Sequence, residues 1–257
     1  MKNFADSLVR KIAEVNNPTV IGLDPKLDYI PDHIKHYAEQ LFPEEATKAT
    51  AKAIWLFNKE IIDHTYDIVP AVKLQYAYYE MYGVDAIKTM LLTARYAQRK
   101  GMIVIGDAKR NDIGSTATAY AEGIIGKTDI LLGETMEMSG FDAATVNCYL
   151  GIDGVQPFID VAERDGKGIF CLVRTSNPSA GDFQDLELGD GRKLYEAVAS
   201  FTAYGKGGIV NASRSIMTAW QKKADFFKPE DFGKAARFEA EDMKEKLNAA
   251  LMNRKYV

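Results

Sequence analysis

The sequence predicts an α/β protein that folds as a single β/α barrel domain over residues 1–257. Two observations favour this fold class. Short apolar runs alternate with longer helical patterns, which implies β/α units joined by right-handed crossovers. Every apolar run also ends in polar or charged side chains, and in a barrel these strand ends converge on one mouth where active sites are built. A barrel is therefore favoured over an open sheet.

The apolar runs resemble strands buried on both faces, as in parallel sheets. They are Thr19–Asp24, Val69–Gln75, Met102–Lys109, Ala143–Asn147, Gly168–Thr175 and Gly208–Asn211. Apolar residues recur at helical spacing over Glu45–His64, Val84–Arg99 and Arg192–Ala203, and over the first residues, Met1–Val15. The first of the chain's helices is expected to be amphipathic and not a signal peptide. No linker rich in Pro, Gly or Ser divides the chain, so one domain is expected.

Composition narrows the possible functions. The chain has 257 residues, 47% of them hydrophobic, and a formal net charge of −4, so no overall positive field favours nucleic acid or an acidic membrane. No apolar run approaches the length of a membrane span. Cys148 and Cys171 lie in apolar runs without metal-type spacing and are expected to be reduced, buried thiols of a cytoplasmic protein.

The three histidines do not suggest a metal site. His33, His36 and His64 follow no predicted strand and have no partner at metal-ligand spacing. Surface or helix-face positions are expected for all three. A zinc mechanism and a Ser-His-Asp mechanism are therefore disfavoured, and no metal ion is expected.

The most informative segment follows the apolar run that begins at Met102. Asp107 and Lys109 are two residues apart, so on an extended strand they would point to the same face, and Asp112 follows where the chain must leave the strand. Core packing does not require two carboxylates around one ammonium group. The arrangement suits a site that keeps a lysine charged, whereas a solvated turn is the alternative interpretation.

The other predicted strands also end in groups that can form hydrogen bonds or carry charge. These are Asp24, Lys73 with Gln75, Asn147, Arg174 to Ser176, and Ser213 with Arg214. Each group alone is weak evidence for a functional site, because strand ends are commonly polar. Together they predict a site at the carboxyl ends of the strands.

Several motifs, in order, resemble those of orotidine 5′-phosphate decarboxylases of the longer bacterial subgroup. The matching segments are Ile21–Pro25, Val72–Gln75, Asp107–Thr116, Thr145–Asn147, Arg174–Pro178 and Ile209–Arg214. The Asp107–Thr116 segment is the specific one. The resemblance runs from near the N-terminus to about Ala203 and resumes over about Tyr204 to Trp220.

The resemblance implies a TIM-type (β/α) barrel homodimer that decarboxylates orotidine 5′-monophosphate to UMP in pyrimidine biosynthesis, without a metal or organic cofactor. By position, the family's charged catalytic array corresponds to Lys73, Asp107, Lys109 and Asp112. The substrate-binding positions correspond to Asp24 for the ribose hydroxyls, Ser176 for the pyrimidine, Arg214 for the phosphate, and Ile113 and Thr116. Asp112, Ile113 and Thr116 would enter the active site of the partner subunit.

The chemistry accounts for these residue types. Loss of CO₂ leaves a carbanion on a ring carbon with little delocalisation, so electrostatic stabilisation must contribute much of the effect. Lys109 is a point cation on a flexible stem that can stabilise this charge and then deliver a proton. The neighbouring carboxylates favour the charged ammonium form, and each pair is worth about 4 kcal/mol at 4 Å before desolvation.

The chain departs from the family pattern near residues 203–207. Two further strands, the second followed by a phosphate-binding loop, precede the Ile209–Arg214 motif in the family, whereas here only Tyr204–Gly207 joins the matching parts. Six strands are therefore predicted instead of eight, and six strands cannot close an eight-stranded barrel. An internal segment is either omitted from this sequence or deleted from the protein. Omission is favoured because both flanks are intact.

Three alternatives remain open. A Mg²⁺-dependent phosphosugar decarboxylase or synthase barrel shares the Asp-x-Lys-x-x-Asp motif, but it would need a carboxylate where Lys73 ends its strand. A Schiff-base aldolase would use Lys109 as a nucleophile, which neighbouring carboxylates disfavour. A catalytically impaired barrel retained as a binding protein is the third, if the deletion is genuine.

Overall fold

A computed structural model describes residues 3–202 and 210–252, which fall into two compact units. The larger unit holds residues 6–107 and 210–252 of the described chain, and the smaller holds residues 3–5 and 108–202. The boundary falls within one strand, β3 (Ile103–Arg110), between Asp107 and Ala108. Each unit is described separately below.

The larger unit is built on a parallel sheet in the order β8-β1-β2-β3. Its other strands are β1 (Thr19–Leu23), β2 (Ala71–Gln75) and β8 (Val210–Ala212). Every residue of β1 is buried, as expected for the inner strand of a parallel sheet. At Gly22 a Cβ atom would lie 1.8 Å from the Ser213 Oγ beyond β8, so a glycine is required for the two chain segments to approach this closely.

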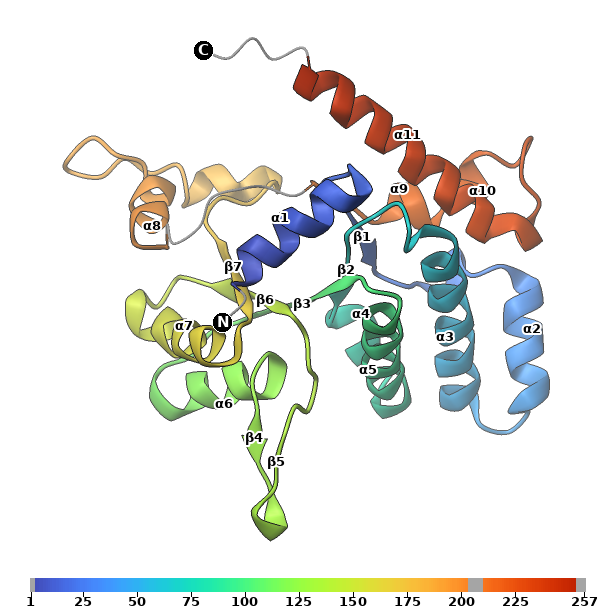
Figure 1. The fold of residues 1–257 in the computed structure, drawn as a ribbon, viewed down its shortest axis with the longest axis horizontal. Coiled ribbons are helices and arrows are strands. Elements are labelled where there is room, and N and C mark those ends of the chain that lie inside the picture. Colours follow the sequence, from blue (N-terminus) through green and yellow to red (C-terminus); the bar gives the residue numbers. More distant parts are fainter. Residues whose placement is uncertain (1–2, 203–209, 253–257) are drawn as a thin grey trace. The chain divides into compact units, whose positions relative to one another are not determined.

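Helices accompany this sheet in the larger unit (Figure 1). They are most of α1 (Phe4–Val15), α2 (Asp32–Leu41), α3 (Ala46–Thr65), α4 (Ala77–Glu80), α5 (Val84–Arg99), α9 (Arg214–Met217), α10 (Ala219–Lys222) and α11 (Phe232–Met252). Helix α3 packs against α2, α5 and α11, and its apolar stripe of Ile54, Phe57 and Ile61 is fully buried. The 3.6-residue periodicity of α3 predicts this buried face, and its burial stabilises the folded state through the hydrophobic effect.

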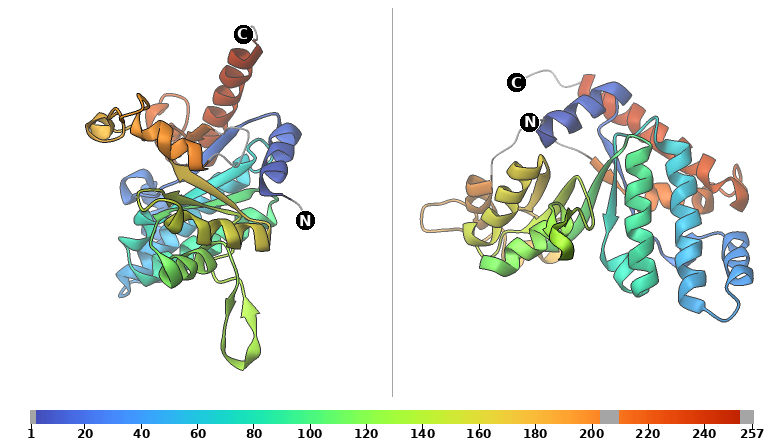
Figure 2. Two further views of the ribbon diagram at one scale, coloured as in Figure 1. Left: turned by 90° about the vertical axis from the view of Figure 1, so that its left-hand side faces the viewer. Right: turned by 60° about the horizontal axis from the view of Figure 1, so that its bottom comes forward.

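The smaller unit contains the parallel strands β6 (Ala143–Asn147) and β7 (Gly168–Leu172), which pair from Ala143↔Gly168 to Asn147↔Leu172. Its helices are α6 (Gly114–Ile124), α7 (Ile152–Asp165) and α8 (Leu194–Thr202), and α6 packs against α7. A two-stranded ribbon of β4 (Thr128–Asp129) and β5 (Thr135–Met136) projects beyond α6 and α7 (Figure 2). The sequence did not predict this ribbon, because its strands are only two residues long.

The predicted strands and helices are confirmed with small shifts at their ends. Strand β7 ends at Leu172 and not at Thr175, because Thr175 N–H donates to the Gln184 side chain and the chain turns into a loop. The predicted end of the third helix at Ala203, the start of the last strand at Gly208 and the join Tyr204–Gly207 lie outside the described residues. Within the described part of the chain, no helix is long and apolar enough to cross a membrane.

The histidines and cysteines mostly occupy the predicted environments. His33 and His36 are exposed on α2, and His64 is on α3. Both cysteines are free thiols. The prediction of burial is confirmed for Cys148 but wrong for Cys171, which is half-buried because β7 is the edge strand of its sheet.

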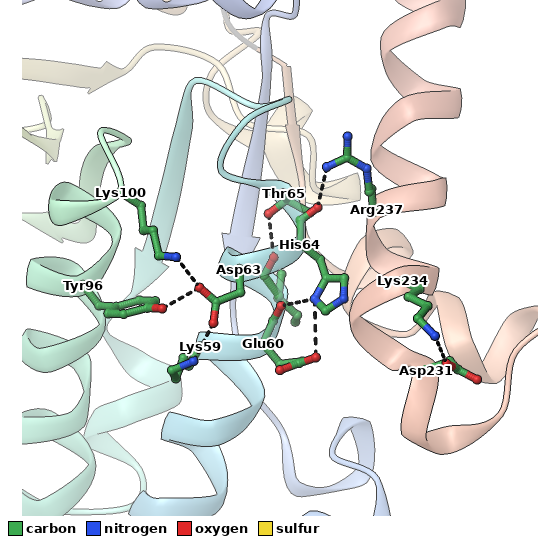
Figure 3. A network of polar contacts seen from close by, with 11 residues as sticks. Lys59, Glu60, Asp63, His64, Thr65, Tyr96, Lys100, Asp231, Lys234 and Arg237 are labelled. Atoms are coloured by element: carbon green, nitrogen blue, oxygen red, sulfur yellow. Dashed lines mark hydrogen bonds and ion pairs between the residues drawn. The ribbon is translucent and has the colours of Figure 1, made fainter.

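A polar network joins α3 to α5 in the larger unit (Figure 3). Lys59 donates to the Asp63 carboxylate from the same helix, while Tyr96 on α5 and Lys100 just beyond it donate to the other oxygen. Burial by itself would raise the pKa of Asp63, but the three donors outweigh it and lower the pKa from 3.8 to about 2. The network therefore requires an ionised carboxylate at position 63.

We expect Asp63→Asn to reduce the free energy of unfolding by about 1 kcal/mol at pH 7, because an amide keeps the shape but loses the charge-assisted bonds. Since folding lowers this pKa, the contribution is complete above pH 3.8 and is lost as the pH falls towards 2. Urea unfolding of both proteins between pH 2 and 7 measures the difference. A difference that persists unchanged at pH 2 would contradict this assignment.

Candidate active site

The register of the larger sheet places polar side chains in a row at the carboxyl ends of β1, β2 and β3. Gln75 lies opposite Asp107, and Asp24 follows Leu23, which lies opposite Leu74. Lys73 is two residues before Gln75 and faces Gly22 and Ile105 across the sheet. Because alternate residues of a strand share a face, these side chains lie on one side of the sheet.

Lys73 joins the two carboxylates of this row. Its Nζ lies 2.6 Å from Asp107 Oδ2 and 3.6 Å from Asp24 Oδ1. Gln75 Nε2 donates a second hydrogen bond of 2.9 Å to Asp107 Oδ2. The side chains of Asp107 and Lys73 are only 6% and 14% exposed, so each charge depends on the other for compensation.

Asp24 retains hydrogen-bonding capacity. Its Oδ1 is buried and has no hydrogen-bond donor among the described residues, since the 3.6 Å separation from Lys73 Nζ is an ion pair without hydrogen-bond geometry. A buried carboxylate oxygen without a donor is costly unless a donor arrives with a ligand. Asp24 can therefore accept a hydrogen bond from a substrate hydroxyl.

Tyr79 supports this row through the backbone of β1. The sequence did not single it out as a site residue. Its hydroxyl donates to the Leu23 carbonyl at 3.1 Å and accepts from Asn58 Nδ2 at 3.0 Å, which anchors the end of β1 immediately before Asp24. Burial raises the pKa of the fully buried Tyr79, so the phenol stays a neutral donor. The sequence indicated only that a cluster of tyrosines follows the second strand.

Lys109 follows Asp107 by two residues along β3, but the backbone there is not simply extended. Lys109 has a φ of +50°, and its N–H donates to Thr145 Oγ1 on β6 at 3.0 Å. Asp107 is buried whereas Lys109 is exposed. The predicted regular, extended strand is therefore wrong at Lys109, where φ is positive.

The residues after Lys109 lead into α6. Asn111 donates to the Asn147 carbonyl at the end of β6, and Asp112 Oδ1 accepts a 2.8 Å hydrogen bond from the Ile113 N–H. Ile113 directly precedes α6 and is 59% exposed, and Thr116 is exposed in the first turn.

The remaining predicted binding residues lie at two other strand ends. Ser176 is exposed in the loop after β7, which is braced by a bidentate ion pair between Arg174 and Asp185 with both bonds at 2.8 Å. A cavity of about 440 Å³ lies beside this loop in the smaller unit and includes Thr175 but not Ser176 in its lining. Arg214 is exposed at the start of α9, directly after β8.

The structure thus brings Asp24, Lys73 and Asp107 into one polar row and adds Gln75 to it. Lys109 is the second-last residue of β3, and Asp112 follows two residues after the strand ends. Charged side chains at the carboxyl ends of parallel strands define the chain as a parallel α/β protein with a candidate active site at the edge where such proteins commonly build one.

Comparison with known proteins identifies the family. The sequence model of the orotidine 5′-phosphate decarboxylase / HUMPS family matches residues 57–231, and the chain belongs to this family. It is 39% identical over 201 residues to the orotidine 5′-phosphate decarboxylase of Caldicellulosiruptor saccharolyticus; the match covers 77% of this chain and 64% of the relative. The chain therefore spans slightly less than two thirds of that relative's length.

A second relative aligns along nearly its whole length. The chain is 31% identical to the orotidine 5′-phosphate decarboxylase of Clostridium perfringens, with coverage of 97% of this chain and 99% of the relative. That alignment extends over 308 positions, 51 more than the 257 residues of this chain. The solved structure of the Leishmania donovani OMP decarboxylase shares the fold, with a TM-score of 0.69 at 23% identity and coverage of 96% of this chain and 98% of that one.

We expect Lys73→Met to reduce the free energy of unfolding by about 3 kcal/mol, because Asp107 then remains buried without its cation. The double variant Lys73→Met/Asp107→Asn removes both charges and should recover part of this loss. Urea unfolding at pH 7 measures both. Equal destabilisation of the single and double variants would show that the ion pair does not control stability here.

Proposed function

We propose that this chain decarboxylates orotidine 5′-monophosphate to UMP, as the names of its relatives indicate for them. The observation that carries the proposal is the ion-paired row of Lys73 and Asp107, from which β3 continues directly to Lys109. Membership of the orotidine 5′-phosphate decarboxylase / HUMPS family limits the reactions that this row of charged residues can catalyse. The reaction is a step of pyrimidine biosynthesis, and the chain performs it without a metal or organic cofactor.

The reaction needs a cation and a proton at one ring carbon. The bond between the pyrimidine ring and its carboxylate breaks, CO₂ leaves, and the electron pair stays on the ring carbon. Lys109 stabilises this carbanion as an ammonium ion and then transfers its Nζ proton to the same carbon. Lys73 holds the Asp107 carboxylate in place through its 2.6 Å ion pair.

The carboxylates contribute by differential binding. Asp107 and Asp112 oppose the substrate carboxylate in the ground state, and this repulsion disappears as CO₂ departs. The charged array therefore favours the transition state over the bound substrate.

The remaining predicted residues bind the non-reacting parts of the nucleotide. Asp24, whose buried Oδ1 lacks a donor among the described residues, accepts from the ribose hydroxyls. Ser176 contacts the pyrimidine, and Arg214 binds the phosphate through charge-assisted hydrogen bonds. Ile113 and Thr116, both exposed, complete the site from a second subunit of a homodimer, together with Asp112.

We further propose that the two units belong to one TIM-type barrel domain of a cytoplasmic enzyme, and that two of its eight strands are absent from this chain. The six parallel strands of the described residues and the 51 additional alignment positions support this interpretation. Intact-mass measurement of protein purified from its natural source distinguishes an omitted segment from a genuine deletion. If the deletion is genuine, the phosphate site is incomplete and impaired activity is expected.

A Mg²⁺-dependent phosphosugar decarboxylase or synthase is the alternative within the same superfamily. It would require a further carboxylate at the strand ends, whereas β2 presents Lys73, with its ammonium 2.6 Å from Asp107. A cation there would repel a divalent metal ion. UMP formation that is unchanged in EDTA would exclude the alternative, whereas activity that requires added Mg²⁺ would overturn the cofactor-free proposal.

We expect Lys109→Ala to lower the rate of UMP formation by several orders of magnitude while the protein stays folded, because it removes the proton donor and the cation together. Absorbance at the pyrimidine wavelengths measures turnover, and circular dichroism checks the fold. Lys88→Ala, on the helix face of α5, is the matched control and should keep its activity. Near-normal turnover by Lys109→Ala would contradict the mechanism.

A mixing experiment tests the shared sites. Lys109→Ala and Asp112→Ala are each expected to be inactive, but one site of their heterodimer carries neither substitution. Random exchange makes about half of the dimers heterodimeric, so about a quarter of wild-type activity should return. Native mass spectrometry confirms the exchange, and confirmed heterodimers without activity would show that Asp112 acts within its own subunit.

A further inference from the structure

The backbone of Lys109 adopts a conformation that side-chain-bearing residues rarely adopt. Among the described residues other than glycine, positive φ values occur at Asn16, Lys109 and Leu132. Asparagine tolerates this region because its short polar side chain can bond locally, and Leu132 lies at the tip of the exposed ribbon between β4 and β5. Lys109 instead lies within β3 and is itself the proposed proton donor.

A side chain on the neighbouring strand contacts the backbone at this point. The Lys109 N–H donates to Thr145 Oγ1 at 3.0 Å. In a regular parallel ladder this N–H would donate to a backbone carbonyl, so the hydroxyl replaces a ladder partner. Ala144 and Val146, which flank Thr145 on β6, are fully buried, and the position of the hydroxyl is therefore set by the core of the smaller unit.

A second contact holds the same segment two residues later. Asn111 Nδ2 donates to the carbonyl of Asn147, two residues beyond Thr145 on the same strand. Helix α7 lies close to this contact, because a Cβ atom at Gly154 would be 2.5 Å from Asn111 Oδ1. The chain from Lys109 to Asn111 is thus attached to β6 at two points, and it departs from regular strand geometry between them.

We infer that Thr145 is a positioning residue for Lys109, the proposed proton donor. The Thr145 hydroxyl holds the Lys109 backbone in the left-handed conformation, and this conformation directs the ammonium group towards the reacting ring carbon. This inference rests on the proposed function for its catalytic consequence and on the hydrogen bond for its structural part. A residue in this conformation persists only when its surroundings hold it there. Thr145 does not contact the substrate in this role.

Two substitutions separate the hydroxyl from the shape of the side chain. Thr145→Val preserves the β-branched shape but removes the acceptor, whereas Thr145→Ser preserves the acceptor and removes a methyl group. Thr89→Val is the control for loss of a buried hydroxyl elsewhere, since Thr89 Oγ1 donates to the Ala51 carbonyl in the larger unit. Thermal unfolding of all three variants separates stability from function.

We expect Thr145→Val to lower kcat about tenfold or more, because a misplacement of about 1 Å is costly in proton transfer. Affinity for UMP, measured by titration calorimetry, should change less than about twofold, because no ligand contact is lost. Thr145→Ser and Thr89→Val should keep kcat within about threefold of wild type. Equal loss of kcat in the two Thr145 variants would overturn the positioning role, since only one of them lacks the acceptor.

Crystal structures of both Thr145 variants give a readout that is independent of activity. The φ of Lys109 should become negative in Thr145→Val and remain positive in Thr145→Ser. A positive φ in Thr145→Val would overturn the inference whatever the kinetics. If the wild-type protein forms no UMP, the proposed function fails, and the two crystal structures still decide whether Thr145 holds Lys109.

Discussion

The arrangement of the larger unit depends on the parallel register of β1, β2 and β3. This register aligns Gly22, Lys73 and Ile105 across the three strands. The ammonium group then reaches Asp107 at 2.6 Å and Asp24 at 3.6 Å. A slip of one residue would turn Lys73 to the opposite face of the sheet and leave two carboxylates without a cation.

The burial of this row has two consequences: it costs desolvation free energy, and it strengthens the interactions between the charges. Two carboxylates and one ammonium group lose much of their hydration when they are mostly buried, and their mutual attraction and the Gln75 hydrogen bond help to offset that loss. In such an environment charges interact more strongly than in water. A site of this kind can therefore bias a reaction in which charge develops on one carbon, as decarboxylation requires.

Strand β3 carries an ion-paired residue, Asp107, and a residue with a positive φ, Lys109, only two positions apart. Asp107 pairs with Gln75 in a regular ladder and its carboxylate is held by Lys73 and Gln75 of β2, whereas the Lys109 N–H is held by a hydroxyl from β6. The larger unit also has a polar network at Asp63, which joins α3 to α5 (Figure 3). The Lys73–Asp107 ion pair thus serves both stability and the proposed chemistry, whereas the Asp63 network serves stability.

Much of the fold was predictable because buried parallel strands and amphipathic helices leave strong local patterns. The strands β1, β2, β3 and β6 and the helices α3 and α5 were found within two residues of their ends. The site residues on those strands were found for the same reason, since Asp24, Lys73 and Asp107 end apolar runs. The β4–β5 ribbon was missed because two-residue strands have no periodicity.

The sequence by itself determined the class of fold, the family and the polar groups at the strand ends, because these depend on local pattern and on motif order. Only the tertiary structure decided the partners of those groups. Gln75 on Asp107, Tyr79 beneath Leu23 and Thr145 on Lys109 are contacts between segments separated by 32 to 56 residues. Such contacts, and the positive φ of Lys109 that accompanies one of them, arise from strand register and core packing, which no local sequence pattern records.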